Sequence, residues 1–316
     1  MKLFSFVFLF LMCTQSACVK SEKSDFEFAN PVPLGDPFIL QHEGTYYAYG
    51  TNADDGIVVY TSSDLQEWER VEELALNRAD SWGDRWFWAP EVYYIAEKDQ
   101  FFMYYSADEH ICVATADSPL GPFRQQEKKP MLEGEKSIDN SLFVDDDGTP
   151  YLYWDRFNDG LNIWVAKLED DLMTIDTSTW TPCIHVSQEW ETVWPRVNEG
   201  PYVLKRGDLY YMTYSANSYE SPHYGIGFAT ASSPMGPWTK YEGNPILQMP
   251  GELVGVGHSA MFEDQDGQLK IVFHAHHDKE HIHPIAMHIA DVSFSEDTPA
   301  VMEISPEILT PRLKKK

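Results

Sequence analysis

Four acidic residues and one histidine recur along the chain in similar surroundings. Each lies at the start of an apolar run or next to a proline, and they follow one another at intervals of about 48 to 60 residues: Asp36, Glu91, Asp139, Glu199 and His258. A single acid of this kind is as easily a turn residue bonded to a nearby amide. The repetition favours a catalytic role over a structural one, because carboxyl groups gathered from distant positions can divide the roles of general acid and general base.

Short aromatic runs, each preceded by a turn signal, recur at a similar interval. The runs are Thr45–Tyr49, Phe101–Tyr105, Tyr151–Trp154, Leu209–Tyr214 and Leu269–His274, and the turns are Glu43-Gly44, Lys98-Asp99, Asp147-Gly148, Gly207-Asp208 and Asp266-Gly267. Such turns supply the positive φ angles of tight hairpins. No helical periodicity of useful length interrupts them, so the pattern predicts an all-β chain.

One loop segment also repeats. Thr115–Phe123 recurs as Thr230–Trp238, and Thr61–Trp68 is a weaker copy. The hairpins and loops together define five units of about 50 to 60 residues: 30–84, 85–133, 134–194, 195–250 and 251–310. Radial repetition of short strands predicts a five-bladed β-propeller of four-stranded antiparallel blades. A β-sandwich joined to a second β domain is the alternative, but it leaves the repeat unexplained.

The innermost strand of each propeller blade lines the central axis, so residues entering those strands face a common funnel. The four acids and His258 would therefore meet at one end of the axis. Gathering like charges there costs stability, which argues against a purely stabilising role. Clusters of this kind are typical of active sites.

The motifs around these residues resemble those of the inverting glycoside hydrolases of family 43, which are five-bladed propellers. The resemblance covers roughly Asn30 to Ser295, and its motifs occur in order, one per blade: Gly35–Pro37, Trp88–Glu91, Ile138–Gly148, Asn198–Pro201 and Gly257-His258. It implies that Asp36 is the general base and Glu199 the general acid. Asp139 matches the acid that orients the proton donor and raises its pKa.

The resemblance also bears on bound ions. His258 matches a residue that, in many members of the family, helps to hold a cation or waters at the axis. The chemistry itself requires no cofactor, but a structural calcium or sodium ion near Glu91 and His258 is an alternative that the sequence leaves open. Zinc is not predicted, because the histidines of the last unit form no compact pair with a carboxylate.

Several further side chains are candidates for binding sugar. Phe87 and Trp88 precede the second motif at the predicted funnel rim, where aromatic rings can stack on sugars, although core packing is the alternative for each. The polar candidates are Glu91, Arg156, Arg196 and His276. Ile285 follows His283-Pro284, where many members of the family carry an arginine, so the family's usual hydroxyl contact is in doubt.

The composition excludes some partners. Lys and Arg number 23 against 50 Asp and Glu, a formal net charge of −27, which disfavours nucleic acid but not a neutral carbohydrate. Cys112 and Cys183 lack the spacing of a metal or redox motif. No partner chain is indicated, and a monomer is expected.

The first residues are typical of an export signal. Lys2 precedes an apolar stretch too short to span a bilayer, and Ser16-Ala17 before Cys18 suggests lipoprotein cleavage. We therefore predict a signal peptide over 1–17, a tether over 18–29 and one catalytic propeller over 30–316. The protein would reach the cell surface or periplasm of a bacterium and touch the membrane only through a lipid anchor; plain secretion is the alternative.

The predicted function is inverting hydrolysis of plant polysaccharide or oligosaccharide by an exo-acting α-L-arabinofuranosidase. β-Xylosidase, arabinanase, galactofuranosidase and galactanase are alternatives within the same family. A carbohydrate-binding propeller without turnover is the non-enzymatic alternative. The array of Asp36, Asp139 and Glu199 disfavours it, since a lectin needs no such set of acids.

Overall fold

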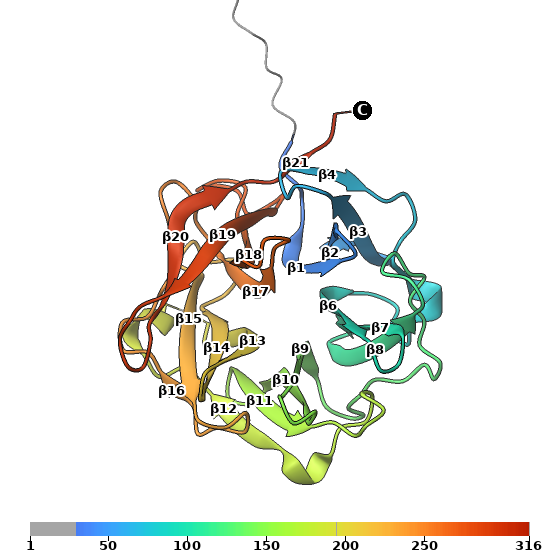
Figure 1. The fold of residues 1–316 in the computed structure, drawn as a ribbon, viewed down its shortest axis with the longest axis horizontal. Helices are drawn as coiled ribbons and strands as arrows, with labels where there is room; N and C mark the ends of the chain where they lie inside the picture. Colours follow the sequence, from blue (N-terminus) through green and yellow to red (C-terminus); the bar gives the residue numbers. More distant parts are fainter. Residues whose placement is uncertain (1–29, 194, 316) are drawn as a thin grey trace, which may run out of the picture.

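The computed structural model describes residues 30–193 and 195–315, and nearly all regular structure in them is β-strand. Five sheets surround a central axis, and the colours of Figure 1 follow the sequence once around the ring. The predicted five-bladed propeller is confirmed. The helices of these residues are single 3₁₀ turns: η1 (Arg78–Asp80), η2 (Thr177–Thr179) and η3 (Glu189–Glu191).

The first two blades differ at their outer edges. Blade 1 runs outward from the axis as β1 (Gly35–His42), β2 (Thr45–Ala53), β3 (Gly56–Ser62) and β4 (Glu67–Arg70), and β5 (Leu76–Asn77) also pairs with β3. Blade 2 consists of β6 (Trp88–Ile95), β7 (Gln100–Ala107) and β8 (His110–Ala116). A single bridge between Thr115 and Arg124 takes the place of its fourth strand.

The other three blades are regular four-stranded antiparallel sheets. Blade 3 holds β9 (Ser137–Val144), β10 (Pro150–Phe157), β11 (Leu161–Lys167) and β12 (Thr181–Ile184). Blade 4 holds β13 (Asn198–Arg206), β14 (Leu209–Ala216), β15 (Gly225–Ala231) and β16 (Thr239–Lys240). Blade 5 holds β17 (Gly257–Glu263), β18 (Leu269–Ala275), β19 (Ala286–Phe294) and β20 (Met302–Leu309).

The two ends of the described chain close the ring at blade 1. β21 (Arg312–Leu313) adds to β4 in parallel, and the Arg312 N–H donates to the Gln66 carbonyl at 2.8 Å. The Val32 N–H donates to the Pro311 carbonyl at 3.0 Å. This closing strand lies beyond the fifth unit, 251–310, that the repeat predicted. It fixes the first blade against the last and so holds the axial residues of both in place.

The second strand of each blade is rich in aromatic and apolar residues because both of its faces are buried. In β10, Tyr151 and Tyr153 pack in the hydrophobic cluster shared with blade 4, whereas Leu152 and Trp154 pack in the cluster shared with blade 2. Successive side chains of a strand point to opposite faces, so one strand supplies both interfaces. The core of the propeller therefore lies between the blades, and the axis is left for polar residues.

The repeated loop segment connects neighbouring blades. The Tyr49 hydroxyl of blade 1 donates to the Pro119 carbonyl of blade 2 at 2.5 Å. The Tyr153 hydroxyl of blade 3 donates to the Pro234 carbonyl of blade 4 at 2.8 Å, the matching position in the second copy. Both tyrosines are fully buried, so each hydroxyl needs a partner, and the repeat supplies it.

Candidate active site

A β-bulge interrupts the innermost strand of every blade at the same place. There the register shifts, and one residue adopts a left-handed backbone: Asp36 (φ 45°), Ala89 (44°), Asp139 (58°), Gly200 (60°) and His258 (49°). This conformation is uncommon for residues with a Cβ and costs on the order of 1–3 kcal/mol in strained positions. Bulges turn side chains out of the alternating pattern, and here they turn them to the axis.

A ring of hydrogen bonds holds these bulges. The backbone N–H of each bulge residue donates to a polar side chain near the end of the second strand of the preceding blade. The acceptors are Thr51 for Ala89 (3.1 Å), Ser106 for Asp139 (3.0 Å), Asp155 for Gly200 (3.0 Å), Ser215 for His258 (2.7 Å) and His274 for Asp36 (3.0 Å). We call these five acceptors the inter-blade ring. Each bulge is thus anchored by the neighbouring blade as well as by its own.

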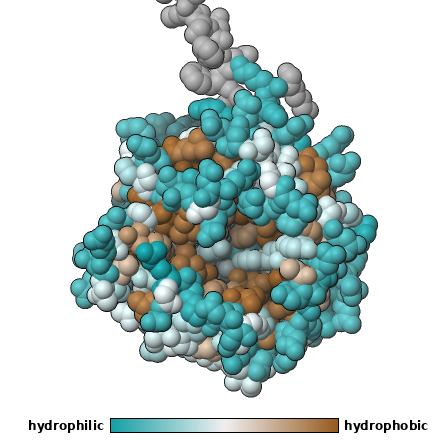
Figure 2. Space-filling model, viewed as in Figure 1, coloured by the Kyte–Doolittle hydropathy of each residue, from teal (hydrophilic) through white to brown (hydrophobic). Residues whose placement is uncertain are grey.

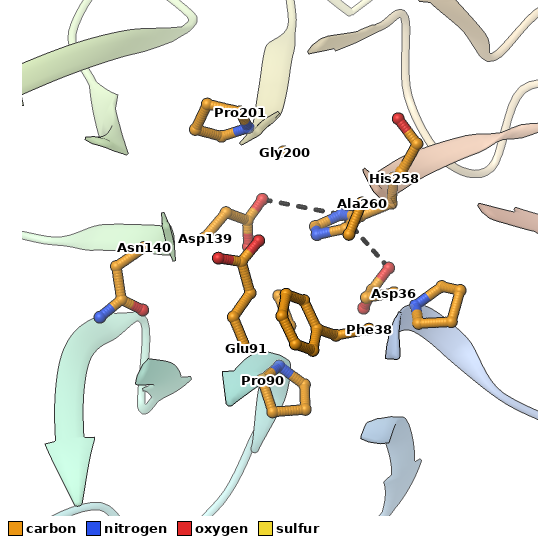
Figure 3. Close-up of a pocket in the computed structure, with 13 residues that line it drawn as sticks. Asp36, Phe38, Pro90, Glu91, Asp139, Asn140, Gly200, Pro201, His258 and Ala260 are labelled. Atoms are coloured by element: carbon orange, nitrogen blue, oxygen red, sulfur yellow. Dashed lines mark ion pairs between the residues drawn. The ribbon is translucent and has the colours of Figure 1, made fainter. Parts of the chain in front are cut away.

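The predicted site residues occupy the bulges in two different ways. Asp36, Asp139 and His258 are themselves the bulge residues, whereas Glu199 precedes one and Glu91 lies two residues after another. Figure 3 shows Asp36, Glu91, Asp139 and His258 pointing toward one another in a narrow axial cavity. Figure 2 shows that the face in view is hollowed at the centre of the ring, with hydrophobic residues gathered around the hollow.

Asp36 is surrounded by donors. The Thr51 hydroxyl donates to Oδ2 at 2.6 Å, and Nδ1 of His258 lies 3.4 Å from Oδ1. Burial alone would raise the pKa of this carboxyl, but the charge of His258 and the contacts of His274 and Thr51 hold the pKa below its usual range. Asp36 is therefore ionised at neutral pH, the state that a general base requires.

Glu199 has the opposite surroundings. Burial and the nearby Asp139 charge raise its pKa to about 8, against the opposing effects of the Tyr224 hydrogen bond and His258. The Tyr224 hydroxyl donates to Oε1 at 2.7 Å and fixes the side chain. Glu199 is therefore protonated at neutral pH and can supply a proton. Burial contributes more to this shift than the repulsion by Asp139 that the sequence suggested.

His258 joins the two sides of the cavity. Its Nδ1 lies 3.4 Å from Asp36 and 3.9 Å from an Asp139 oxygen, and dashed lines in Figure 3 mark both ion pairs. Burial opposes a charged ring, but the surrounding carboxyls outweigh it and raise the pKa of His258. A protonated histidine at this point offsets part of the like-charge repulsion among the acids.

Glu91 also lines the cavity, but it differs from the other acids. The Tyr93 hydroxyl donates a hydrogen bond to Oε2. Burial raises the pKa of Glu91 to about 7, although the Tyr93 hydrogen bond acts in the other direction. Its carboxyl therefore titrates near neutrality and offers both a donor and acceptors to a hydroxyl group.

The two aromatic candidates, Phe87 and Trp88, differ in their exposure to solvent. Phe87 is 1% exposed and packs on Tyr105 in the hydrophobic core, so the expectation that it lines the funnel is wrong. Trp88 is partly exposed, and Trp86 stacks on it with ring centroids 5.5 Å apart. Arg85 lies over the Trp86 ring at 3.8 Å. Trp88 and the more exposed Trp86 are thus the aromatic side chains of this segment that remain accessible.

The other polar candidates do not meet at the cavity. Arg156 pairs with Glu135, its Nη2 donating to Oε2 at 2.7 Å. Arg196 is half exposed and donates to the exposed Asp159 at 3.0 Å. His276 is buried with Nε2 at 2.6 Å from the Tyr219 carbonyl. None of these three side chains is among the residues that line the axial cavity.

Four residues that support the cluster were not singled out by the sequence. Thr51, Asp155 and His274 belong to the inter-blade ring, and Tyr224 donates to Glu199. A signal for the ring was present, because a polar residue follows the aromatic part of each second strand. Tyr224 had no comparable signal, since it lies before β15 and reaches Glu199 only through the fold.

The described residues contain neither a grouped set of metal ligands nor a reactive thiol. Within 30–193 and 195–315, no three His, Cys, Asp or Glu side chains are grouped so as to hold a metal ion. Cys112 is buried, and Cys183 is partly buried; both are free thiols. Burial raises the pKa of the Cys112 thiol to about 12, so it is not a reactive thiolate.

The fold and the cluster together suit an acid–base hydrolase, because an ionised carboxyl, Asp36, and a protonated one, Glu199, both interact with Asp139 and His258. Comparison with known proteins gives the family. Residues 28–298 match the family described as Glycosyl hydrolases family 43. The chain belongs to that family, and it is a glycoside hydrolase, which needs no cofactor for catalysis.

Individual relatives cover most of the chain. It is 27% identical over 288 residues to a β-D-galactofuranosidase of Aspergillus niger, covering 82% of this chain and 80% of the relative. An extracellular exo-α-(1→5)-L-arabinofuranosidase of Streptomyces chartreusis is 30% identical over 286 residues, covering 80% and 84%. A structure titled endo-1,4-β-xylanase, from Bacteroides thetaiotaomicron, is 49% identical with a TM-score of 0.87, covering 91% of this chain and 99% of that one.

Proposed function

We propose that this glycoside hydrolase is an exo-acting α-L-arabinofuranosidase that removes terminal sugars from plant polysaccharides or oligosaccharides with inversion. The observation that carries the proposal is the opposite ionisation of Asp36, which lines the narrow axial cavity, and Glu199, which directly precedes the lining residue Gly200. Inverting hydrolysis needs one carboxylate to activate water and one carboxylic acid to protonate the leaving oxygen. Asp36 takes the first role and Glu199 the second.

The reaction follows from these two states. Asp36 accepts a proton from a water molecule as that water attacks the anomeric carbon, and Glu199 gives its proton to the departing oxygen. Asp139 keeps the proton on Glu199 before the reaction through its negative charge. We propose that Glu91, which lines the cavity, holds the sugar by hydrogen bonds and that the partly exposed Trp88 holds it by stacking.

Inversion is supported by the positions of the two blades. Asp36 comes from β1 and Glu199 from β13, which Figure 1 shows on different sides of the ring, separated by other blades. Inverting enzymes need their carboxyls roughly 6.5–9.5 Å apart to admit water, whereas retaining ones need about 5–5.5 Å. Proton NMR of the first-formed product tests this. A product with the substrate's own anomeric configuration would remove Asp36 from the role of base.

The sugar is proposed from the relatives, of which several carry the name exo-α-(1→5)-L-arabinofuranosidase. The test is a panel of p-nitrophenyl glycosides: α-L-arabinofuranoside, β-D-galactofuranoside and β-D-xyloside. We expect the highest kcat/KM on the arabinofuranoside. A preference for galactofuranoside would favour the activity named for the Aspergillus niger relative, and a preference for the xyloside would contradict the proposed arabinofuranosidase. Binding without release of p-nitrophenol would indicate a carbohydrate-binding propeller.

The place of action is also a proposal. The predicted signal peptide, Cys18 and the tether lie outside the described residues, and among those described no helix has the length and hydrophobicity to cross a membrane. Three arabinofuranosidase relatives are named extracellular. We propose export to the bacterial surface or periplasm with a lipid anchor on Cys18. Cys18→Ala should then move the protein from the membrane fraction to the soluble one; unchanged fractionation would contradict the anchor.

A structural calcium or sodium ion at the axis is a separate proposal. Nδ1 of His258 already faces Asp36 and Asp139, so we propose that any such ion binds through waters to the carboxyl groups and leaves the His258 ring in its ion pairs. Calcium added after dialysis against a chelator should raise the melting temperature. No change in melting temperature would contradict the ion. We further propose that the enzyme acts as a monomer.

A further inference from the structure

One member of the inter-blade ring differs chemically from the others. Thr51, Ser106 and Ser215 accept the bulge N–H through a hydroxyl, and His274 accepts it through a ring nitrogen. Asp155 accepts the Gly200 N–H through a carboxyl, although a hydroxyl serves the same purpose in three other blades. A carboxyl is the more costly group to bury. The four other blades are an internal control, and they show that anchoring the bulge does not require an acid.

The described surroundings of Asp155 leave its second carboxyl oxygen without a partner. The side chain is fully buried, Oδ2 accepts from the Gly200 N–H at 3.0 Å, and no donor reaches Oδ1. Across β10 and β9 Asp155 pairs with Ile138, the residue next to Asp139 in the bulge. The Asp139 carboxyl is itself only 7% exposed, and a hydrogen bond between the two carboxyls is among the influences on the pKa of each. Two ionised carboxylates cannot form that hydrogen bond, because neither has a proton to donate.

We propose that Asp155 is a positioning residue that stays protonated and donates its Oδ1–H to Asp139, so that Asp139 remains ionised beside the general acid. The inference rests on the proposed roles of Asp139 and Glu199. The proposed role involves no net proton transfer, since the proton remains on Asp155 throughout the reaction. The same carboxyl also binds the backbone N–H that follows Glu199, so it ties the charge-bearing acid of blade 3 to the proton donor of blade 4.

The groups that face Asp155 support this protonation state. They are Asp139 on β9, Glu199 on β13 and the Cys183 thiol on β12. Burial, the Asp139 charge and the Asp139 hydrogen bond raise the pKa of Asp155 well above its usual range. For Asp139, the hydrogen bond from Asp155 and the charge of His258 act against burial, which is the main cause of its raised pKa.

A direct test measures whether the Asp155 carboxyl is protonated. Protein labelled with ¹³C only at aspartate carboxyl carbons excludes Glu91 and Glu199 from the spectrum. Near pH 7 to 8 we expect one aspartate with the chemical shift of a protonated carboxyl, and its loss in Asp155→Asn. A spectrum with every aspartate ionised would overturn the inference. This readout needs no substrate, so it stands apart from any failure of the proposed glycosidase activity.

Variants test the positioning role. Asp155→Asn keeps an acceptor for Gly200 and a neutral donor for Asp139, so kcat and its pH profile should stay within about threefold of wild type. Asp155→Ser copies the residue of blades 2 and 4: it keeps the bulge anchor but lacks the reach to Asp139. We expect it to lose about tenfold in kcat with KM nearly unchanged, and its alkaline limb should move to lower pH.

Two outcomes would contradict the inference. If Asp155 is ionised, Asp155→Asn removes a negative charge near Glu199. The alkaline limb of the pH profile would then move to lower pH in that variant too. If Asp155→Ser keeps full activity and an unchanged pH profile, Asp155 only anchors the bulge and does not act on Asp139. Melting temperatures of both variants, measured alongside, separate a loss of folded protein from a loss of catalysis.

Discussion

Two sides of the propeller axis bury a carboxyl group to a similar degree and leave it in opposite states. On the blade 1 side, Asp36 faces His258 and accepts from Thr51, and its pKa lies below the usual range. On the blade 4 side, Glu199 faces Asp139, and its pKa rises to about 8. Burial pushes both values upward, so the neighbouring charges decide the difference. The two sides can thus divide acid and base chemistry although their backbones are built alike.

The backbone comparison sharpens this point. Both acids lie at a β-bulge held by the inter-blade ring, with a left-handed residue at Asp36 on one side and Gly200 on the other. Asp36 is the bulge residue, whereas Glu199 comes one position earlier and is held instead by the Tyr224 hydroxyl. A shared scaffold therefore presents two acids by different routes. The following variants test each side separately.

Removal of the base should have the largest effect. Asp36→Asn keeps the size of the side chain but cannot accept a proton from water, so kcat should fall about 10³- to 10⁴-fold. The loss should be similar for activated aryl glycosides and for natural oligosaccharides, because both need water activation. Initial rates on both substrates measure it. A large loss on only one of them would show that Asp36 is not the base.

Removal of the acid should distinguish between substrates. Glu199→Gln should lose about 10²- to 10³-fold on oligosaccharides, whose leaving groups need a proton, and far less on p-nitrophenyl glycosides. A plot of rate against leaving-group pKa measures the difference. If Glu199→Gln and Asp36→Asn give plots of equal slope, the assignment of acid and base to the two sides is incorrect.

The pH profile should show the two states directly. Activity needs Asp36 ionised and Glu199 protonated, so it should persist below the usual pKa of aspartate and decline as pH rises past about 8. Asp139→Asn removes the charge that raises the Glu199 pKa, and the alkaline limb should move to lower pH by about one unit. An alkaline limb that stays in place would show that Asp139 does not act on Glu199.

A smaller shift in the opposite direction should follow from the tyrosine. Tyr224→Phe removes a donor that stabilises the ionised form of Glu199, so the alkaline limb should move upward by less than about one unit. The kcat at the pH optimum should fall only a few-fold. The pair of variants Asp139→Asn and Tyr224→Phe thus moves one limb in two directions, and a shift of both to the same side would contradict the described contacts.

The smallest effect is expected away from the axis. Arg196 is half exposed and pairs with the exposed Asp159, so Arg196→Ala should change kcat and KM less than about twofold and stability by less than about 0.5 kcal/mol. Steady-state kinetics and thermal melting check both. A tenfold rise in KM with unchanged kcat would instead place Arg196 in sugar binding, as the sequence suggested.

The inner strands account for most of what could be predicted from the sequence. Each carries its polar residue near the same point of a repeated unit, and a closed ring of such units must bring these points to one axis. The convergence of Asp36, Asp139 and His258 therefore follows from repetition and local turns alone. Hairpin turns and aromatic runs are local properties of the chain, which is why the number of blades could be read without coordinates.

The tertiary structure decided which face each side chain takes and what lies across from it. Phe87 and Trp88 are neighbours, yet one is in the core and the other at the surface, because successive side chains alternate and the bulge shifts that alternation. Asp155 and Arg156 differ in the same way: one reaches Gly200, and the other pairs with Glu135. The ionisation of Glu199 depends on burial and on Asp139 from another blade, and distances between blades are set only when the ring closes.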